Sequence, residues 1–190
     1  IKVGDTIYLD LTGKLVKHCK SLVSIDHNED SIEYCREKFK QVKNVDFVHA
    51  SVNDVKNLPH KQYDIILSGW AGLHYSKDLP KTLEQLHKLL AKNGTLILIE
   101  AYQGSEYVKI LNLIRPKASK VNEKQNELTS LLFKTFKTVD KKIISTRYVF
   151  PSYEKLEETF KIELVYEEGS VWHDKDSKKL RKYVDGKSNL

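Results

Sequence analysis

The stretch from Tyr63 to Glu100 constrains the fold of this chain most strongly. It opens with an apolar run over residues 63–68 and closes with a second one over residues 95–100. Between them, residues 78–91 carry leucines at helical spacing. Two buried strands joined by a crossover helix run parallel, and parallel strands of this kind read as continuous apolar runs. The stretch therefore predicts a parallel β-α-β unit.

The expected crossover helix has clear boundaries and one apolar face. Ser76 or Asp78 can cap its first turn, and Pro80 fits that turn because the missing N–H needs no partner there. Gly94 is expected to end the helix in the left-handed conformation. The buried face is predicted to consist of Leu79, Leu83, Leu86 and Leu90.

The chain before this unit also alternates strands and helices. Apolar runs predict strands over residues 6–11, 22–26 and 45–49, and helical spacing predicts helices over 14–20 and 28–40, the second capped by Asn28 or Asp30. Such alternation is typical of an α/β fold, with a doubly wound, mostly parallel sheet and helices on both faces.

The chain after Glu100 has weaker patterns. Helices are predicted over residues 105–115, 122–136, 151–160 and 178–184, and strands over 142–150 and 162–166. We expect a single domain over residues 1–190, in which residues 1–102 bind the cofactor and residues 103–190 form the substrate side.

Composition excludes several classes of protein. No run of eighteen apolar residues is present, so no membrane partner is expected, and a cytoplasmic location is the simplest expectation. The two cysteines, Cys19 and Cys35, have no metal-ligand spacing, and no metal is expected. The net charge is +1 for residues 1–100 and +5 for residues 101–190. A basic second half leaves an RNA partner possible, but its charges are mostly interleaved with acidic residues.

Ligands of an open parallel sheet bind beyond the carboxyl ends of its strands. The loops at this end are residues 11–14, 26–27, 50–54 and 68–75. Asp26 ends an apolar strand, and a carboxylate there can accept hydrogen bonds from both hydroxyls of a ribose. Because Asn28 and Asp30 can cap the next helix, Asp26 is expected to be free for this role.

The chain resembles class I S-adenosylmethionine-dependent methyltransferases over about residues 3–102. The resemblance rests on the order and spacing of four segments: residues 9–15, 23–26, 64–74 and 93–100. It implies a seven-stranded sheet with the last strand antiparallel, whose final strands would be residues 142–150 and 162–166. It also implies S-adenosylmethionine as cofactor and S-adenosylhomocysteine as product.

One departure from the family concerns its first loop, which usually contains three glycines. Here the chain reads Asp10-Leu11-Thr12-Gly13, as if three residues, two of them glycine, were removed between Leu11 and Thr12. Glycines let backbone approach a ligand closely. Three explanations stay open: the loop is missing from the sequence, the loop is degenerate in a non-catalytic relative, or residues 2–6 are the degenerate loop.

The resemblance carries a set of candidate site residues. After the third strand Ser51 and Val52 replace the acidic residue that often meets the adenine amino group, and Ser51 or Asn53 could contact the base edge. His74 is the candidate general base, with Tyr75 beside it at the substrate mouth. The expected cofactor-binding residues are Asp10, Thr12, Gly13, Asp26, His27, Ser51, Val52, Ser68 and Trp70.

These features predict a methyltransferase that acts on an unidentified acceptor, with a small molecule favoured. Two alternatives stay open: a non-catalytic binding or scaffold protein of the same fold, and an RNA-directed methyltransferase. The methyl donor is already activated, so orientation of the acceptor supplies most of what the protein must add. The oligomeric state is not predicted.

Overall fold

The computed structural model describes residues 7–59, 62–69, 72–102, 104–114, 121–165 and 171–187. The chain divides into two compact units. Unit 1 consists of Ile1–Glu100 and Leu128–Thr138, and unit 2 consists of Ala101–Glu127 and Val139–Leu190.

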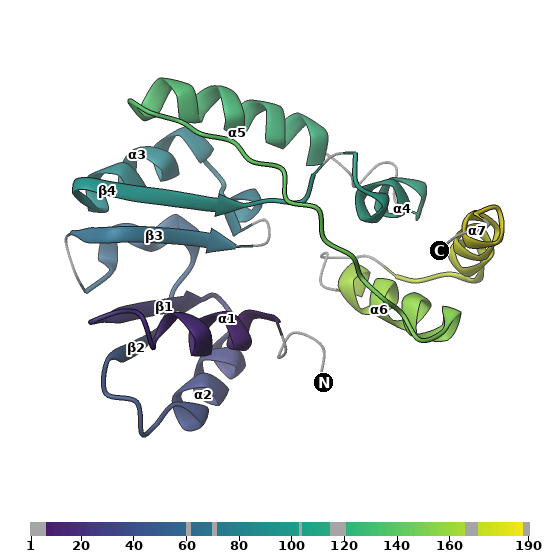
Figure 1. Ribbon diagram of the computed structural model, residues 1–190, viewed down its shortest axis with the longest axis horizontal. Coiled ribbons are helices and arrows are strands. Elements are labelled where there is room, and N and C mark those ends of the chain that lie inside the picture. Colours follow the sequence, from purple (N-terminus) through teal and green to yellow (C-terminus); the bar gives the residue numbers. More distant parts are fainter. Residues whose placement is uncertain are drawn as a thin grey trace. The chain divides into compact units, whose positions relative to one another are not determined.

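Unit 1 contains two pairs of parallel strands (Figure 1). β1 (Leu22–Asp26) pairs with β2 (Val45–His49), and β3 (Tyr63–Gly69) pairs with β4 (Leu90–Ile99). The α/β class and these parallel strands are as predicted. The described residues form two separate two-stranded ladders, so they do not build the expected seven-stranded sheet.

Two helices of unit 1 begin at the predicted caps. α2 (Glu29–Lys38) follows Asn28, whose side chain accepts a hydrogen bond from the Ser31 N–H at 3.0 Å. α3 (Leu79–Leu89) follows Asp78, which accepts from the Lys81 N–H at 3.1 Å. Two short 3₁₀ helices, η1 (Val52–Asn57) and η2 (Gly72–Tyr75), follow β2 and β3.

The predicted strand over residues 6–11 is wrong for the part that the structure describes. Residues Ile7–Leu15 form helix α1. Of the helix predicted over residues 14–20, only residues 14 and 15 are helical, as the end of α1, and residues 16–18 form a turn. Ile7, Leu11 and Leu15 are four residues apart, which suits one face of a helix as well as it suits a strand. With no loop between Leu11 and Thr12, nothing interrupts this helical spacing.

The junction between α3 and β4 also differs from the prediction. Asn93, with φ of 66°, adopts the left-handed conformation that was expected of Gly94. The ladder register jumps from Tyr63 opposite Leu90 to Ile65 opposite Thr95, so residues 91–94 form a bulge. Gly94 is needed here for close packing, because a Cβ at this position would lie 2.9 Å from the Tyr63 carbonyl oxygen.

One hydrophobic core lies between the strand pairs and the helices of unit 1. Its buried members are Val55, Leu73, Leu83, Leu86, Leu89 and Leu128. Ile25 of β1, Ile66 of β3 and Leu98 of β4 pack against this cluster, so both ladders share it. The opposite face of β3 and β4 is open, since Ile65 is 62% exposed and Ile97 and Ile99 are also exposed.

Unit 2 is helical in its described part. α4 (Glu106–Ile114), α6 (Tyr153–Val165) and α7 (Asp174–Asp185) bury a cluster of Ile110, Ile114, Phe160 and Leu180. α5 (Val121–Thr135) begins in this unit and ends in unit 1. Hydrogen bonds from Lys187, Tyr183 and Lys109 hold the pKa of Glu106 down at about 2.

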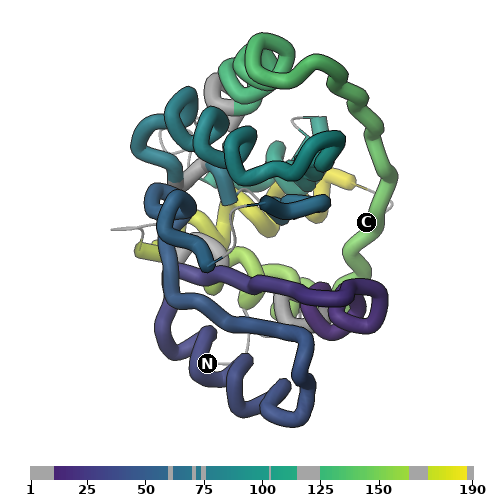
Figure 2. Tube along the Cα trace, turned by 90° about the vertical axis from the view of Figure 1, so that its left-hand side faces the viewer, coloured from purple at the N-terminus to yellow at the C-terminus, as the bar shows by residue number. Residues whose placement is uncertain are grey.

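The two strands predicted in the second half, over residues 142–150 and 162–166, are wrong for the part that the structure describes, which does not include Tyr166. Residues 142–150 are irregular, and Figure 2 shows them as one long run without coils between α5 and α6. No ladder partner is described for this segment, so its β-branched residues stay exposed, with Ile144 at 80%. Residues 162–165 continue α6 instead, because Tyr153, Leu156 and Phe160 anchor a helical face on the unit 2 core.

Candidate cofactor-binding site

A cleft of about 490 Å³ opens at the carboxyl ends of β1 and β2. It lies where a parallel sheet usually binds its ligand. Apolar and polar side chains both line it, which suits a flat base with a polar edge. The lining residues are His27, Val48, His49, Ala50, Ser51, Asp54, Asn57 and Leu58.

Asp26 is the last residue of β1 and directly precedes His27, which lines the cleft, and the turn after β1 holds its carboxylate. Its Oδ1 accepts a hydrogen bond from the Asn28 N–H at 2.9 Å and lies 3.4 Å from Nδ1 of His27. Asn28 caps α2 as expected. Asp26 is nevertheless only partly free, because its Oδ1 already accepts the hydrogen bond from the Asn28 N–H. Within the part of the chain that the structure describes, no group binds Oδ2, and the side chain is 37% exposed. One carboxylate oxygen can thus meet a ligand hydroxyl.

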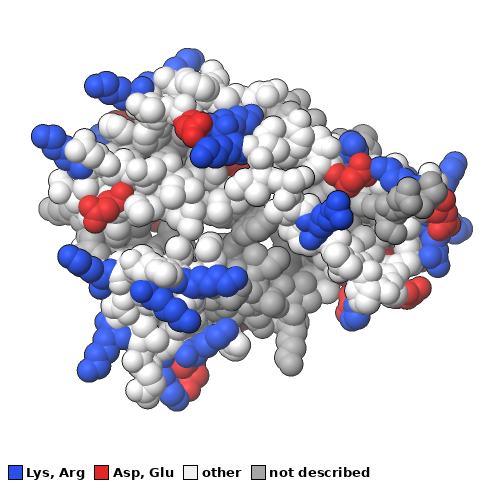
Figure 3. Space-filling view, in the orientation of Figure 1, with Lys and Arg blue, Asp and Glu red and all other residues white. Residues whose placement is uncertain are grey.

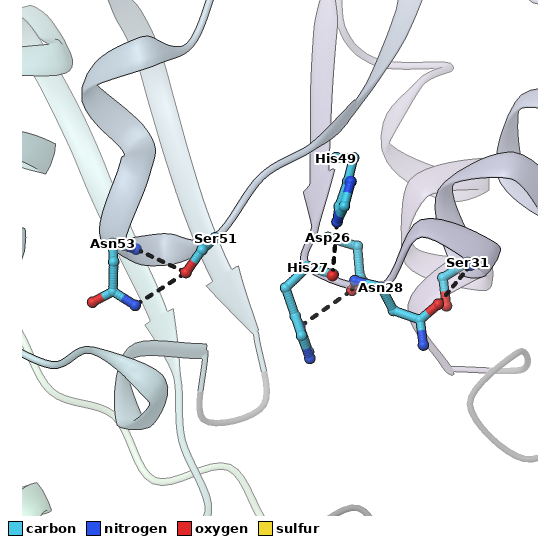
Figure 4. A network of polar contacts seen from close by, with 7 residues as sticks. All are labelled: Asp26, His27, Asn28, Ser31, His49, Ser51 and Asn53. Carbon is cyan, nitrogen blue, oxygen red and sulfur yellow. Dashed lines mark hydrogen bonds and ion pairs between the residues drawn. The ribbon is translucent and has the colours of Figure 1, made fainter.

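The residues after β2 form a second polar turn (Figure 4). Ser51 Oγ accepts hydrogen bonds from the backbone N–H of Asn53 at 3.2 Å and from its Nδ2 at 3.0 Å. Asn53 Oδ1 accepts from the Lys77 N–H at 2.8 Å, which ties this turn to the segment before α3. Asn53 therefore braces the loop, whereas Ser51 lines the cleft and Val52 packs against the core.

Three further predicted site residues that the structure describes, Thr12, Gly13 and Ser68, do not line this cleft. Thr12 and Gly13 lie within α1, where Gly13 approaches the Phe39 ring. Ser68 lies in β3, so close to Gly72 that a Cβ there would stand 2.7 Å from the serine oxygen. Several further residues lie wholly or with their side chains outside the described part of the chain: Asp10, Trp70, His74 and Tyr75.

Sequence reasoning missed His49, Val48, Asn57 and Leu58 as cleft residues. His49 has the clearest signal, because it is the last residue of a strand at the ligand-binding end. Asn57 and Leu58 have no such signal in the sequence, because they lie several residues beyond the end of β2 and reach the cleft only through the fold of η1. Among the described residues, no cluster of His, Cys, Asp or Glu has the arrangement of a metal site.

Glu100 directly follows the carboxyl end of β4, and its pKa is far from that of an ordinary glutamate. Burial raises its pKa from 4.5 to about 7. Because the folded state holds the proton more tightly than the unfolded chain, this group contributes stability below pH 4.5. That contribution is lost as the pH rises from 4.5 to 7.

We therefore expect Glu100→Gln to flatten the pH dependence of the unfolding free energy. Relative to wild type, the variant should gain on the order of 1 kcal/mol at pH 8 and little at pH 4. Urea denaturation at both pH values measures this. Glu127→Gln, at an exposed carboxyl, is the control. An equal gain at both pH values for Glu100→Gln would contradict the assignment.

A known protein family matches the first half of the chain. Residues 9–98 match the family model described as a methyltransferase domain. The match confirms the resemblance to class I S-adenosylmethionine-dependent methyltransferases for this part of the chain. The expected enzyme class, a methyltransferase, is the one that this family model describes.

Individual relatives cover part of the chain. Demethylmenaquinone methyltransferase of Staphylococcus saprophyticus is 29% identical over 92 residues, which are 47% of this chain and 38% of the relative. The chain thus spans well under half the length of this curated relative.

Two solved structures are similar to part of this chain. The N-methyltransferase NodS of Bradyrhizobium japonicum, solved with S-adenosylhomocysteine, gives a TM-score of 0.39 at 24% identity, covering 46% of this chain and 44% of NodS. YcgJ of Bacillus subtilis gives 0.46 at 18% identity, covering 64% of this chain and 56% of YcgJ.

No helix among the described residues combines the length and the apolar character needed to cross a membrane.

Proposed function

We propose that this chain is a S-adenosylmethionine-dependent methyltransferase that binds the adenosine part of its cofactor in the cleft beside Asp26. The observation that carries the proposal is the carboxylate of Asp26, which is held at the end of β1 with one oxygen open to a ribose. The cleft beside it is large enough for an adenine ring, and Ser51 and Asp54 supply polar groups for the base edge.

The protein's own part in the reaction is binding and orientation. When bound, the cofactor supplies an activated methyl group on a sulfonium. Asp26 and the cleft fix the nucleoside, so that the donor end is held in one place while an acceptor approaches. A general base is needed only for a protonated acceptor, and His74 is our candidate for it.

A small molecule is the acceptor that we propose, in the cytoplasm. The supporting observation is the name of the curated relative, which gives demethylmenaquinone as its substrate. The face of the molecule that Figure 3 draws gives the RNA-directed alternative no specific support. On the face drawn in Figure 3, lysine and arginine side chains are spread over several parts of the molecule with acidic ones among them.

Calorimetric titration with S-adenosylhomocysteine tests the proposal. We expect wild type to bind it with a micromolar Kd and Asp26→Ala to bind it roughly 10–100-fold more weakly, since a hydrogen bond to a charged group is lost. Asp46→Ala, at an exposed carboxyl of β2, is the control and should bind like wild type. No binding by folded wild-type protein would refute the proposal.

One observation favours the non-catalytic alternative. Residues 7–15 form α1 where the family has its first strand and glycine loop, so the described chain offers no glycine cradle for the amino-acid end of the cofactor. Sequencing the gene between the codons of Leu11 and Thr12 separates the two candidates. Glycine codons there would rule out the non-catalytic reading, whereas an uninterrupted junction with no methyl transfer would favour it.

A further inference from the structure

His49 makes a contact that its place in the ladder does not require. It is the register partner of Asp26 at the carboxyl end of β2. Its side chain reaches past Asp26, and Nε2 lies 2.9 Å from the carbonyl oxygen of His27 (Figure 4). A carbonyl oxygen only accepts, so Nε2 of His49 carries the proton and donates.

The carbonyl that His49 binds belongs to the peptide group that orients Asp26. The His27 C=O and the Asn28 N–H are the two ends of one planar peptide. The N–H end donates to Asp26 Oδ1 at 2.9 Å, while the C=O end accepts from His49 at 2.9 Å. A third bond, from the Ala50 N–H to the Asp26 carbonyl oxygen at 2.9 Å, fixes the preceding peptide.

We infer that His49 is a positioning residue for nucleoside binding, acting through the His27–Asn28 peptide on the carboxylate of Asp26. The inference rests on the proposed function, because Asp26 is the group that meets the ribose there. If the donor on residue 49 is removed, the peptide can rotate and its N–H leaves Oδ1. The carboxylate then samples several orientations, and binding must first select the correct one.

A direct contact between His49 and the ligand is the competing explanation, since the imidazole also lines the cleft. The two explanations differ in how His49 and Asp26 combine. A residue that acts through Asp26 has no effect once the carboxylate is gone, whereas a residue that touches the ligand keeps its effect.

The experiment is a double-mutant cycle read by calorimetric titration with S-adenosylhomocysteine. We expect His49→Leu to weaken binding about 3–10-fold, as the loss of one hydrogen bond would. His49→Gln places an amide N–H near the position of Nε2 and should restore most of the affinity. In the Asp26→Ala background, His49→Leu should change the Kd less than twofold. His18→Leu, at an exposed histidine in the turn before β1, is the control for loss of an imidazole.

A second readout needs no ligand. Amide exchange at Asn28, followed by NMR, should speed up in His49→Leu and not in His18→Leu, while the urea midpoint changes little. Binding by wild type together with unchanged affinity in His49→Leu would overturn the inference, and so would additive effects of the two substitutions. No binding by wild type would refute the proposed function instead, and the exchange rate of Asn28 would then still decide whether His49 orders the turn.

Discussion

Replacing Gly94 with alanine is expected to lower the free energy of unfolding by about 1–3 kcal/mol. The added Cβ would stand 2.9 Å from the Tyr63 oxygen, 3.0 Å from the Ala91 oxygen and 3.1 Å from the Ala91 nitrogen. All three are backbone atoms of β3 and of the bulge that starts the regular part of β4, so they cannot turn aside as a side chain would. Urea denaturation of the whole chain measures the change.

Gly13→Ala is the matched control, and its effect should have the opposite sign. Gly13 lies within α1, and a Cβ there would meet the Phe39 ring at 3.5 Å, an ordinary van der Waals distance. Alanine in a helix is favoured over glycine by roughly 0.5–1 kcal/mol. If both substitutions were stabilising, the close approach at Gly94 would be disproved. If both were destabilising, the helical assignment of Gly13 would be in error.

Leu83→Ala should cost about 2–5 kcal/mol of unfolding free energy. Leu83 is 0% exposed and lies in the cluster that joins α3 to both strand pairs. Removing three carbon atoms from such a site loses their burial and leaves a cavity that rigid neighbours only partly fill. Because Leu83 does not line the cleft, we expect the Kd for S-adenosylhomocysteine to stay unchanged wherever the variant is still folded.

Leu79→Ala provides the comparison for Leu83→Ala. Leu79 begins the same helix and packs against the same cluster, but it is only half-buried. Its truncation should therefore cost clearly less, since solvent already reaches the site. Equal costs at the two positions, measured by the same denaturation series, would show that Leu83 does not lie at the centre of the core.

The β-α-β unit from Tyr63 to Glu100 could be predicted from sequence because its local and tertiary preferences agree. Asp78 caps α3, Pro80 suits its first turn, and Leu83 and Leu86 are buried as expected. β1, β2 and α2 were predictable for the same reason. Each is a short periodic segment with a cap or turn residue at its ends.

The secondary-structure predictions are wrong where the sequence pattern suits two kinds of structure, or where a strand needs another strand to pair with. Residues 7–11 have apolar residues that suit a strand or a helix, and in the structure they form a helix. The segment over 142–150 has a strand's composition, but a strand forms only when another strand pairs with it. Local pattern carries no information on that partner.

The sequence predicted where the candidate site lies better than it predicted which residues contact one another there. Asp26, His27 and Ser51 were expected at the strand ends, and they lie there. The role of Asn53 as a brace and the reach of His49 to the His27 carbonyl depend on three-dimensional distances. Neither follows from residue type or spacing.

The pairing of the strands has a consequence for how the chain folds during synthesis. In both ladders a strand pairs with the next strand along the chain, β1 with β2 and β3 with β4. Contacts between segments close in sequence need only short loops to close, which favours fast formation. The β1–β2 ladder ends at His49 and the lining of the cleft ends at Leu58, so both precede β3 in the chain. The proposed nucleoside site can therefore form early, and later segments then pack against it.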